Sequence, residues 1–507
     1  MNQAPWADRL QRGIAALQAG DAAGALRLIE SAHAEAPEEP VLRYWLGNAC
    51  RASGQTGRAE RLLAELVRDE PGDTEAAFGL AFLLREQGRL AEAERVLDQH
   101  AARTDDAKAL LRVVAFLREC NALEAALAIL DRVIERQPDA GLLLRRARML
   151  QNLGRFEAAL ADCRAALDRD PGLGGAWLSL ALLQRFDDEQ HPDLERMRAA
   201  GPAELGEDGS MGLAFALGKA LDDLDRPAEA FAQFRAGNSI RARQQPWDRA
   251  AWNDWLQQAL AREPEPPLAG GDQRRPLFVI GMLRSGTTLL EEHLARHPRI
   301  TARGEMNWLA HVARHHPDPR RLSAADRAQL GDDLWRQLRR DGPADHVYVD
   351  KNPLNFRFVD LALALLPGAR FVHVERDPRD SALSCYFQLF QHPDTAFTND
   401  LEDLADYVSG YRRLVDHWRT AYPDRVHDVH YEQMVSEPEA ALRDVLAFLE
   451  LDWDPAVLTA GEDARPVRTA SAWQARQPVH RSSVGKWQRY ADQAPEFFER
   501  LAPAPGG

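Results

Sequence analysis

Small residues recur along the first half of the chain at a fixed interval, between turn positions. The turn residues are spaced by 33 or 34 residues: Gly20, Gly54, Gly88, Asn121 and Gly154. An alanine lies five residues after each turn residue. The residue seven positions before each turn residue is small in most of the repeats. Loop positions keep the same spacing at Pro37, Pro71, Thr104, Pro138 and Pro171. Because small residues let paired helices approach closely, this pattern predicts stacked helical hairpins.

The array resembles tetratricopeptide repeats. The resemblance covers about residues 5–172 as five repeats, weakens through "RFDDEQHPDLERM" and returns once at "LAFALGKALDDLDRPAEAFAQFRAGN". We therefore expect an all-helical solenoid over residues 1–260. Such an array serves either as a rigid spacer or homodimerisation arm, or as a concave surface that binds a peptide or protein partner.

A different pattern follows residues 261–275, a linker rich in proline, glycine and charge. Short apolar runs alternate there with helical stretches: "PLFVIGM", "HVYVDK", "RFVHVER" and "RVHDVHYEQM". The alternation predicts an α/β domain over residues 276–507, with a central parallel sheet covered on both faces. Ligands of such sheets lie at the carboxyl ends of the strands. The four runs end in polar residues there: Arg284 and Ser285, Lys351, Arg376, and Tyr431.

Composition narrows the function classes. The 507 residues carry a net charge of −15, which argues against nucleic acid or an anionic membrane as the main partner. Four cysteines stand without close pairing, as in proteins of a reducing compartment. The start of the chain lacks the pattern of a secretory signal, and no apolar run reaches the roughly 18 residues of a membrane span. We expect a cytoplasmic protein without a membrane span.

The segment "PLFVIGMLRSGTTLLEEHL" runs a strand through a glycine loop into a helix. Gly281 and Gly286 have the spacing of a phosphate-binding loop, but Thr287 stands where a nucleotide-binding loop has lysine. Backbone amides at such a helix start bind a tetrahedral anion. Without the lysine a triphosphate is disfavoured. Arg284 instead offers a planar guanidinium group, which suits a smaller, doubly charged group. The alternative is a tight turn without a ligand.

This loop resembles that of sulfotransferases that use PAPS (3′-phosphoadenosine 5′-phosphosulfate). In that family the loop binds the 5′-phosphosulfate, which implies a role for Arg284, Ser285, Gly286, Thr287 and Thr288. A second family motif, which binds the 3′-phosphate, resembles "VERDPRDSALSCYF" with Arg376 and Ser384. The closest resemblance is to the tyrosylprotein type. It spans about residues 276–490 and includes "RGEMNW", "DKNP", "HYEQMV" and "SAWQARQPVHRSSVGKW".

The resemblance implies roles for further residues. Glu305 would be the general base, and Lys351 and Arg284 would stabilise charge on the transferred group. Ser471 would donate a hydrogen bond to the leaving phosphate, and Tyr431 and Lys486 would contact the cofactor. The chain has only four lysines against 63 basic residues in all, and the two in its C-terminal half fall on these positions. No metal is expected, since His315 and His316 are adjacent rather than spaced as ligands.

The sequence also departs from the peptide-sulfating pattern. Met306, Asn307 and Trp308 follow Glu305, where enzymes that act on acidic peptides carry a basic residue. The acceptor hydroxyl is therefore left open among a protein tyrosine, a carbohydrate, a lipid and a small molecule. Two other functions stay open as well. One is a kinase-like phosphotransferase, which should have the missing lysine and an aspartate for magnesium, and the other is a non-catalytic repeat scaffold.

Overall fold

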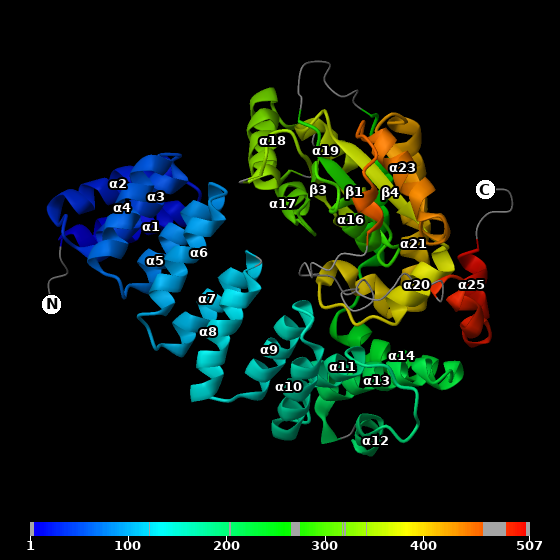
Figure 1. Cartoon of the computed structure of the whole chain (residues 1–507). Coiled ribbons are helices and arrows are strands. Elements are labelled where there is room, and N and C mark those ends of the chain that lie inside the picture. Colours follow the sequence, from blue (N-terminus) through cyan, green and yellow to red (C-terminus); the bar gives the residue numbers. More distant parts are fainter. Residues whose placement is uncertain are drawn as a thin grey trace. The chain divides into compact units, whose positions relative to one another are not determined.

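The chain forms two compact units, Met1–Pro138 and Asp139–Gly507. The computed structural model describes residues 5–120, 122–201, 204–264, 274–316, 318, 321–340, 342–459 and 483–502. Figure 1 shows the helices of the first unit and the mixed helices and strands of the second. The boundary between the two units lies inside the predicted repeat array.

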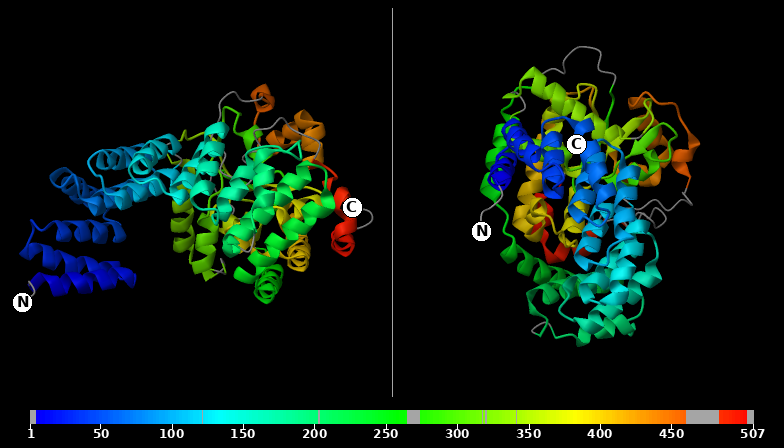
Figure 2. Two further views of the ribbon diagram at one scale, coloured as in Figure 1. Left: turned by 90° about the horizontal axis from the view of Figure 1, so that it is seen from below. Right: turned by 90° about the vertical axis from the view of Figure 1, so that its left-hand side faces the viewer.

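The first unit consists of paired helices, as the periodicity predicts. Its helices are α1 (Pro5–Gln18), α2 (Ala22–Glu35), α3 (Pro40–Ala52), α4 (Thr56–Asp69), α5 (Thr74–Glu86), α6 (Leu90–Ala101), α7 (Ala107–Glu119) and α8 (Leu123–Arg136). Consecutive hairpins lie side by side in all views (Figures 1 and 2). The turn glycines Gly20, Gly54 and Gly88 have φ between +74° and +83°, a conformation that favours glycine.

Small residues lie where the helices cross. A Cβ atom on Gly13 would lie 2.5 Å from the Ile29 side chain, and one on Gly47 would lie 2.8 Å from Leu63. The alanines five residues after each turn are fully buried, as Ala25 and Ala59 illustrate. Close packing therefore explains why these positions are small, and the prediction of tetratricopeptide-type hairpins is confirmed for this unit.

The second unit begins with more helices. They are α9 (Ala140–Asn152), α10 (Phe156–Arg169), α11 (Gly174–Leu182), α12 (Pro192–Ala199), α13 (Gly206–Asp223), α14 (Pro227–Gln244) and α15 (Arg249–Leu260). The hairpin of α13 and α14 again packs closely, because a Cβ on Gly218 would lie 2.9 Å from the Phe234 ring. The predicted return of the repeat at these residues is therefore a helical hairpin.

A five-stranded parallel sheet follows. Its strands are β1 (Leu277–Gly281), β2 (Ile300–Ala302), β3 (Val347–Asp350), β4 (Arg370–Glu375) and β5 (Val426–His430). Their order across the sheet is β2-β3-β1-β4-β5, and every neighbouring pair is parallel. β1 lies in the centre and is buried along its whole length, as expected for a strand covered on both faces.

Helices cover both faces of the sheet. One face packs against α16 (Thr287–Leu294), α22 (Tyr431–Ser436), α23 (Pro438–Phe448) and η5 (Pro455–Leu458). The elements of the other face are α17 (Trp308–His315), α18 (Ala324–Arg339), η3 (Pro353–Phe358), α19 (Val359–Leu365), α20 (Pro378–Tyr386), η4 (Pro393–Asn399), α21 (Leu401–Ala421), η7 (Lys486–Gln493) and α25 (Pro495–Arg500). The predicted α/β fold is confirmed.

Helices α13 to α15 share a core with the second face. The rings of Phe234 and Phe387 stack with centroids 4.0 Å apart, and the Asn238 amide donates to the Tyr386 carbonyl over 2.8 Å. On α21, a Cβ at Gly410 would lie 2.8 Å from the Leu256 side chain. The last helices before the sheet are thus built into the α/β domain. Within the described residues, no helix combines the length and apolar character needed to cross a membrane.

Candidate active site

Polar residues follow all five strands at their carboxyl ends. The loop with Arg284 follows β1, and Glu305 comes three residues after β2. Lys351 comes directly after β3, Arg376 directly after β4, and Tyr431 directly after β5. Because parallel strands end at the same edge of a sheet, these side chains gather around one region.

The loop after β1 has an unusual backbone. Gly286 has φ of +103° and precedes the first residue of α16, and Arg284 has φ of +68°. A Cβ atom on Gly286 would lie 2.4 Å from the Tyr431 ring. Glycine is therefore required both by the conformation and by the approach of Tyr431, and the loop backbone faces the start of α22.

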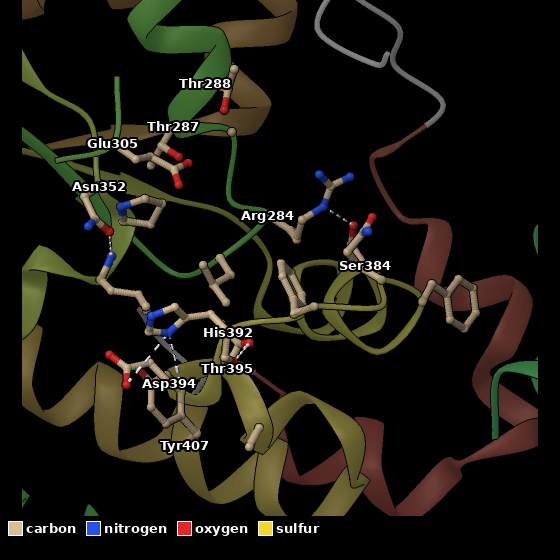
Figure 3. A pocket seen from close by; sticks show the side chains of 18 of the residues that line it. Arg284, Thr287, Thr288, Glu305, Asn352, Ser384, His392, Asp394, Thr395 and Tyr407 are labelled. Carbon is tan, nitrogen blue, oxygen red and sulfur yellow. Dashed lines mark hydrogen bonds and ion pairs between the residues drawn. The ribbon is translucent and has the colours of Figure 1, made fainter. Parts of the chain in front are cut away.

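One group of side chains consists of Arg284, Ser384, Arg376 and Tyr431. The Arg284 Nε donates to the Ser384 hydroxyl over 3.0 Å (Figure 3). The Arg376 Nη1 donates to the Arg284 carbonyl over 2.9 Å, and its guanidinium lies 4.7 Å from the Tyr431 ring centre. Burial, helped by the charge of the neighbouring Arg376, lowers the pKa of Arg284 to about 10. Two guanidiniums this close favour an anion between them.

Two buried polar atoms in this group have no protein partner among the described residues. They are the Ser285 hydroxyl oxygen and the Arg376 Nε. A buried polar group without a hydrogen bond costs about 1–3 kcal/mol. Atoms of this kind beside an anion-binding loop are suited to donate to a phosphate or sulfate oxygen.

Lys351 and Glu305 form the centre of a second group. The Lys351 Nζ lies 2.6 Å from Glu305 Oε1 and 4.0 Å from Glu291 Oε2. The Lys351 side chain is 0% exposed, whereas that of Glu305 is 44% exposed. Burial raises the pKa of the Glu291 carboxyl, and the Lys351 charge opposes this shift. The ammonium therefore lies beneath Glu305, and Glu305 itself reaches solvent.

The backbone on both sides of Glu305 is held by one fully buried and one largely buried carboxyl group. Glu291 accepts from the Gly304 amide over 2.9 Å, and Asp350 accepts from the Met306 amide over 3.1 Å. The Asp350 side chain is fully buried, and burial raises its pKa to about 8. The Asn352 amide also donates to the Met306 carbonyl over 3.0 Å. Glu305 is thus positioned by groups on α16, β3 and the turn that follows β3.

Both groups face one large cleft of about 1650 Å³ in the second unit. Its lining includes Arg284, Glu305, Arg376 and Ser384, as well as Lys486. Figure 3 shows Glu305 and Thr287 on one side of the loop and Arg284 and Ser384 on the other. Four more of the predicted site residues also line the cleft: Gly286, Thr287, Thr288 and Tyr431.

Two further predicted residues remain. Lys486 lines the cleft while its ammonium donates a hydrogen bond to Asp222 on α13. Ser471 lies outside the described residues.

Models of two protein families match the chain. A family model described as "Sulfotransferase family" matches residues 276–455. Models described as "Tetratricopeptide repeat" match residues 16–80, 51–115 and 120–173. Residues 276–455 are a sulfotransferase-family domain, and tetratricopeptide repeats precede it in the sequence. The predicted resemblance is thereby confirmed.

Individual relatives of the sulfotransferase domain come from animals and bacteria. An uncharacterised protein of Aquifex aeolicus is 34% identical over 238 residues, which cover 44% of this chain and 31% of that protein. Protein-tyrosine sulfotransferase 1 of Danio rerio is 26% identical over 235 residues, covering 42% of this chain and 65% of that protein. The chain thus spans less than two thirds of the length of either relative.

Solved structures include further neighbours. The sulfotransferase domain of an olefin synthase from Synechococcus PCC 7002 is 20% identical, with a TM-score of 0.36. The match covers 48% of this chain and 99% of that domain.

Several residues that shape the cleft were not predicted. They are Glu291, Asp350, Asn352 and Asp380, all of which hold backbone groups near the cleft. A charged residue at the end of a buried strand was the available signal for Asp350. Glu291 has the ordinary spacing of a helix residue, so nothing in the sequence marks it.

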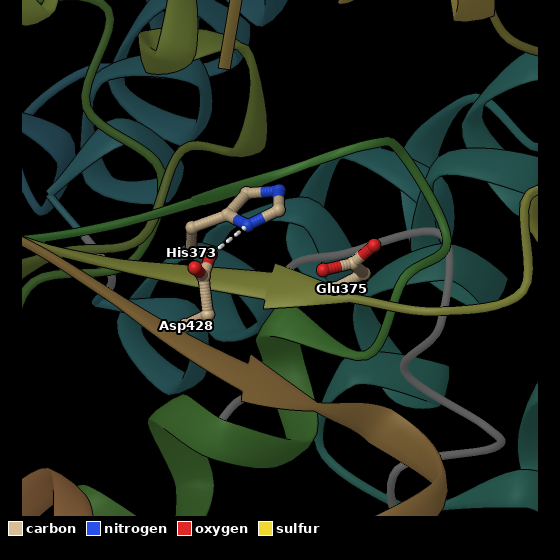
Figure 4. Close-up of side chains that lie close together, drawn as sticks. All are labelled: His373, Glu375 and Asp428. Atoms are coloured by element: carbon tan, nitrogen blue, oxygen red, sulfur yellow. Dashed lines mark hydrogen bonds and ion pairs between the residues drawn. The ribbon is translucent and has the colours of Figure 1, made fainter. Parts of the chain in front are cut away.

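A second polar cluster lies on two strands of the sheet. His373, Glu375 and Asp428 come close together on β4 and β5 (Figure 4). The Arg419 Nη2 lies 2.9 Å from Glu375 and 2.8 Å from Asp428. Although burial alone would raise the pKa of Asp428, hydrogen bonds from His373 and Arg419 hold it well below its usual range. A guanidinium therefore already supplies the positive charge that these carboxylates require.

Proposed function

We propose that this protein is a PAPS-dependent sulfotransferase that transfers the sulfuryl group to an acceptor hydroxyl, with Glu305 as general base. The observation that carries the proposal is the position of a solvent-accessible Glu305, held by a buried lysine, in the same cleft as an anion-binding loop and the arginines Arg284 and Arg376. Membership of residues 276–455 in the sulfotransferase family and the names of the animal relatives support it.

The loop and its neighbours would hold the cofactor. The loop amides around Gly286, with Ser285, Thr287 and Thr288, suit the 5′-phosphosulfate. Arg376 and Ser384, at the end of β4 and on α20, suit the 3′-phosphate. PAPS, when bound, supplies an activated sulfuryl group on a phosphate leaving group. The unpartnered hydroxyl of Ser285 and Nε of Arg376 would each gain an acceptor oxygen.

Glu305 is placed to take a proton. Its carboxylate lies at the cleft while Lys351 holds it from below, so the oxygen that does not face Lys351 can accept a proton from an acceptor hydroxyl. Sulfuryl transfer resembles phosphoryl transfer, in which positioning and electrostatic stabilisation do most of the work. Arg284 and the loop amides supply positive charge in the cleft, and Lys351 adds its charge from beneath.

The acceptor side of the cleft is partly apolar. The lining includes the half-buried side chains of Trp247, Trp255, Leu354 and Phe358. Several charged side chains of the lining are paired, as in Arg262 with Asp360 and Arg357 with Asp394. Paired charges do not favour a strongly acidic peptide. We propose a hydroxyl on an uncharged protein segment, carbohydrate or small molecule, with the repeats available to bind a peptide or protein partner.

Calorimetry with two nucleotides tests this function. PAP, the desulfated product of PAPS, should bind to the full chain, whereas ATP with magnesium should bind far more weakly because the loop lacks its lysine. Tight binding and turnover of magnesium-ATP without PAP binding would support a kinase-like phosphotransferase. Binding of neither nucleotide would support a non-catalytic scaffold.

A further inference from the structure

We propose that Asp222, on helix α13, is a positioning residue for the cofactor site. It holds the segment 483–493 against the anion-binding loop, so the last helical hairpin before the sheet is a working part of the transferase site. The proposal rests on the proposed function, because it takes the ligand of that loop to be PAPS or PAP.

Asp222 bonds to three residues of the segment: Lys486, Tyr490 and Arg489, which donates from Nη1 to Oδ1 over 3.5 Å and from Nη2 to the Asp222 carbonyl over 3.3 Å. The Asp222 Oδ2 accepts from the Lys486 ammonium, and its Oδ1 accepts from the Tyr490 hydroxyl over 2.6 Å. The Asp222 side chain is 14% exposed, and Tyr490 is fully buried among Phe231 and Phe387. In the described part of the chain, Asp222 is the carboxylate within ion-pair distance of Lys486. A charge-assisted bond in a partly buried place is stronger than one at the surface.

The other side of the same segment touches the cofactor site. The Ser483 carbonyl accepts from Arg376 Nη2, while Arg376 Nη1 donates to the Arg284 carbonyl. Asp380 on α20 accepts from the amides of Gly485 and Trp487 over 2.6 and 2.8 Å. A continuous set of hydrogen bonds therefore runs from Asp222 through the segment to Arg376 and the anion-binding loop. Asp222 lies 54 residues before the start of the family match at residue 276.

The arrangement allows two opposite effects of Asp222. If Asp222 positions Lys486 and the segment, its removal should loosen Arg376 and weaken cofactor binding. If Asp222 instead competes with the cofactor phosphate for Lys486, its removal should strengthen binding. We infer the first, because Asp222 also binds Tyr490, which does not line the cleft, and because Lys486 lines the cleft while held by Asp222.

The test is PAP binding to the full-length Asp222→Asn variant. The amide keeps the size of the carboxylate but loses its charge, so we expect PAP to bind about 10-fold more weakly than to the wild type. Glu229→Gln is the matched control. Glu229 lies on α14 of the same hairpin, is 55% exposed and pairs with Arg226 outside the segment and the cleft lining, so this change should leave PAP binding unchanged.

Two further measurements separate positioning from general loss of stability. Hydrogen exchange without nucleotide should increase in residues 483–493 of Asp222→Asn and stay unchanged in β1 and β4. The effects of Asp222→Asn and Lys486→Met on PAP affinity should be less than additive, because they act through one contact. Should Asp222→Asn fail to fold, Tyr490→Phe removes one of these bonds and should still weaken PAP binding by about 3-fold.

The outcomes distinguish this inference from the proposed function. A wild-type protein that does not bind PAP contradicts the proposed function. A wild-type protein that binds PAP, with unchanged or tighter binding by Asp222→Asn, contradicts the role of Asp222 alone. Additive effects of Asp222→Asn and Lys486→Met would likewise overturn it.

Discussion

Lys351 lies 2.6 Å from Glu305, with its ammonium fully buried and the carboxylate at the cleft. The two residues follow neighbouring strands, β3 and β2, so the pairing is a consequence of strand order. A buried lysine beneath a solvent-accessible glutamate fixes the place of one carboxylate oxygen and leaves the other for an acceptor. This relationship is the basis of the catalytic role proposed for Glu305.

Glu305→Gln keeps the shape of the side chain and removes its ability to accept a proton. We expect sulfate transfer to fall by about 100-fold or more, with PAP affinity nearly unchanged, because Glu305 does not belong to the arginine group. Transfer is measured as the radiolabel that passes from PAPS to fractions that contain the acceptor, and PAP binding is measured by calorimetry. Glu439→Gln, a surface change on α23, is the control. Transfer at the wild-type rate by Glu305→Gln would refute the general base.

Lys351→Arg keeps the positive charge but replaces a compact ammonium with a wide planar group. The site of Lys351 is fully buried among Glu305, Glu291 and Asp350, so the larger group should displace Glu305. We expect severe loss of transfer and a lower melting temperature, while Arg-for-Lys at the exposed Lys108 should change neither. A fully active Lys351→Arg enzyme would contradict the tight fit around the ammonium.

Asp350 should make stability depend on pH. Burial raises its folded-state pKa to about 8, above an ordinary unfolded value of about 4. Between these values the folded state binds more protons than the unfolded state, so the Asp350 contribution to stability falls as pH rises from about 4 to 8. Asp350→Asn removes this contribution. Melting temperatures of the two proteins should therefore diverge in favour of the variant as pH rises; a constant difference would contradict the raised pKa.

Gly286→Ala tests the geometry of the anion-binding loop. Alanine at positive φ costs about 1–2 kcal/mol at either Gly286 or Gly304. Only at Gly286 would the new methyl group meet another residue, the Tyr431 ring at 2.4 Å. Gly286→Ala should therefore lower the melting temperature more than Gly304→Ala and weaken PAP binding, and Tyr431→Ala should relieve part of this. Equal losses at the two glycines would argue against the close contact.

The fold was largely predictable because its signals are local. Turn glycines such as Gly54 and Gly88 mark hairpins wherever they occur, and apolar runs mark buried strands. Pairings between distant residues were not predictable in the same way. Glu291 reaches Gly304 only because α16 packs beside β2, and Asp222 meets Lys486 across 264 residues. The roles of Glu305, Arg376 and Ser384 came from family resemblance and stay predictions.

The central claim is that the cleft holds a nucleotide with a 3′-phosphate, and a titration with PAP and AMP tests it most directly. In excess chelator, PAP should bind more tightly than AMP by about 2–4 kcal/mol, because Arg376 and Ser384 would contact the additional phosphate. Arg376→Ala should reduce this difference and leave the fold intact. Equal affinity for PAP and AMP in the wild-type protein would contradict the account.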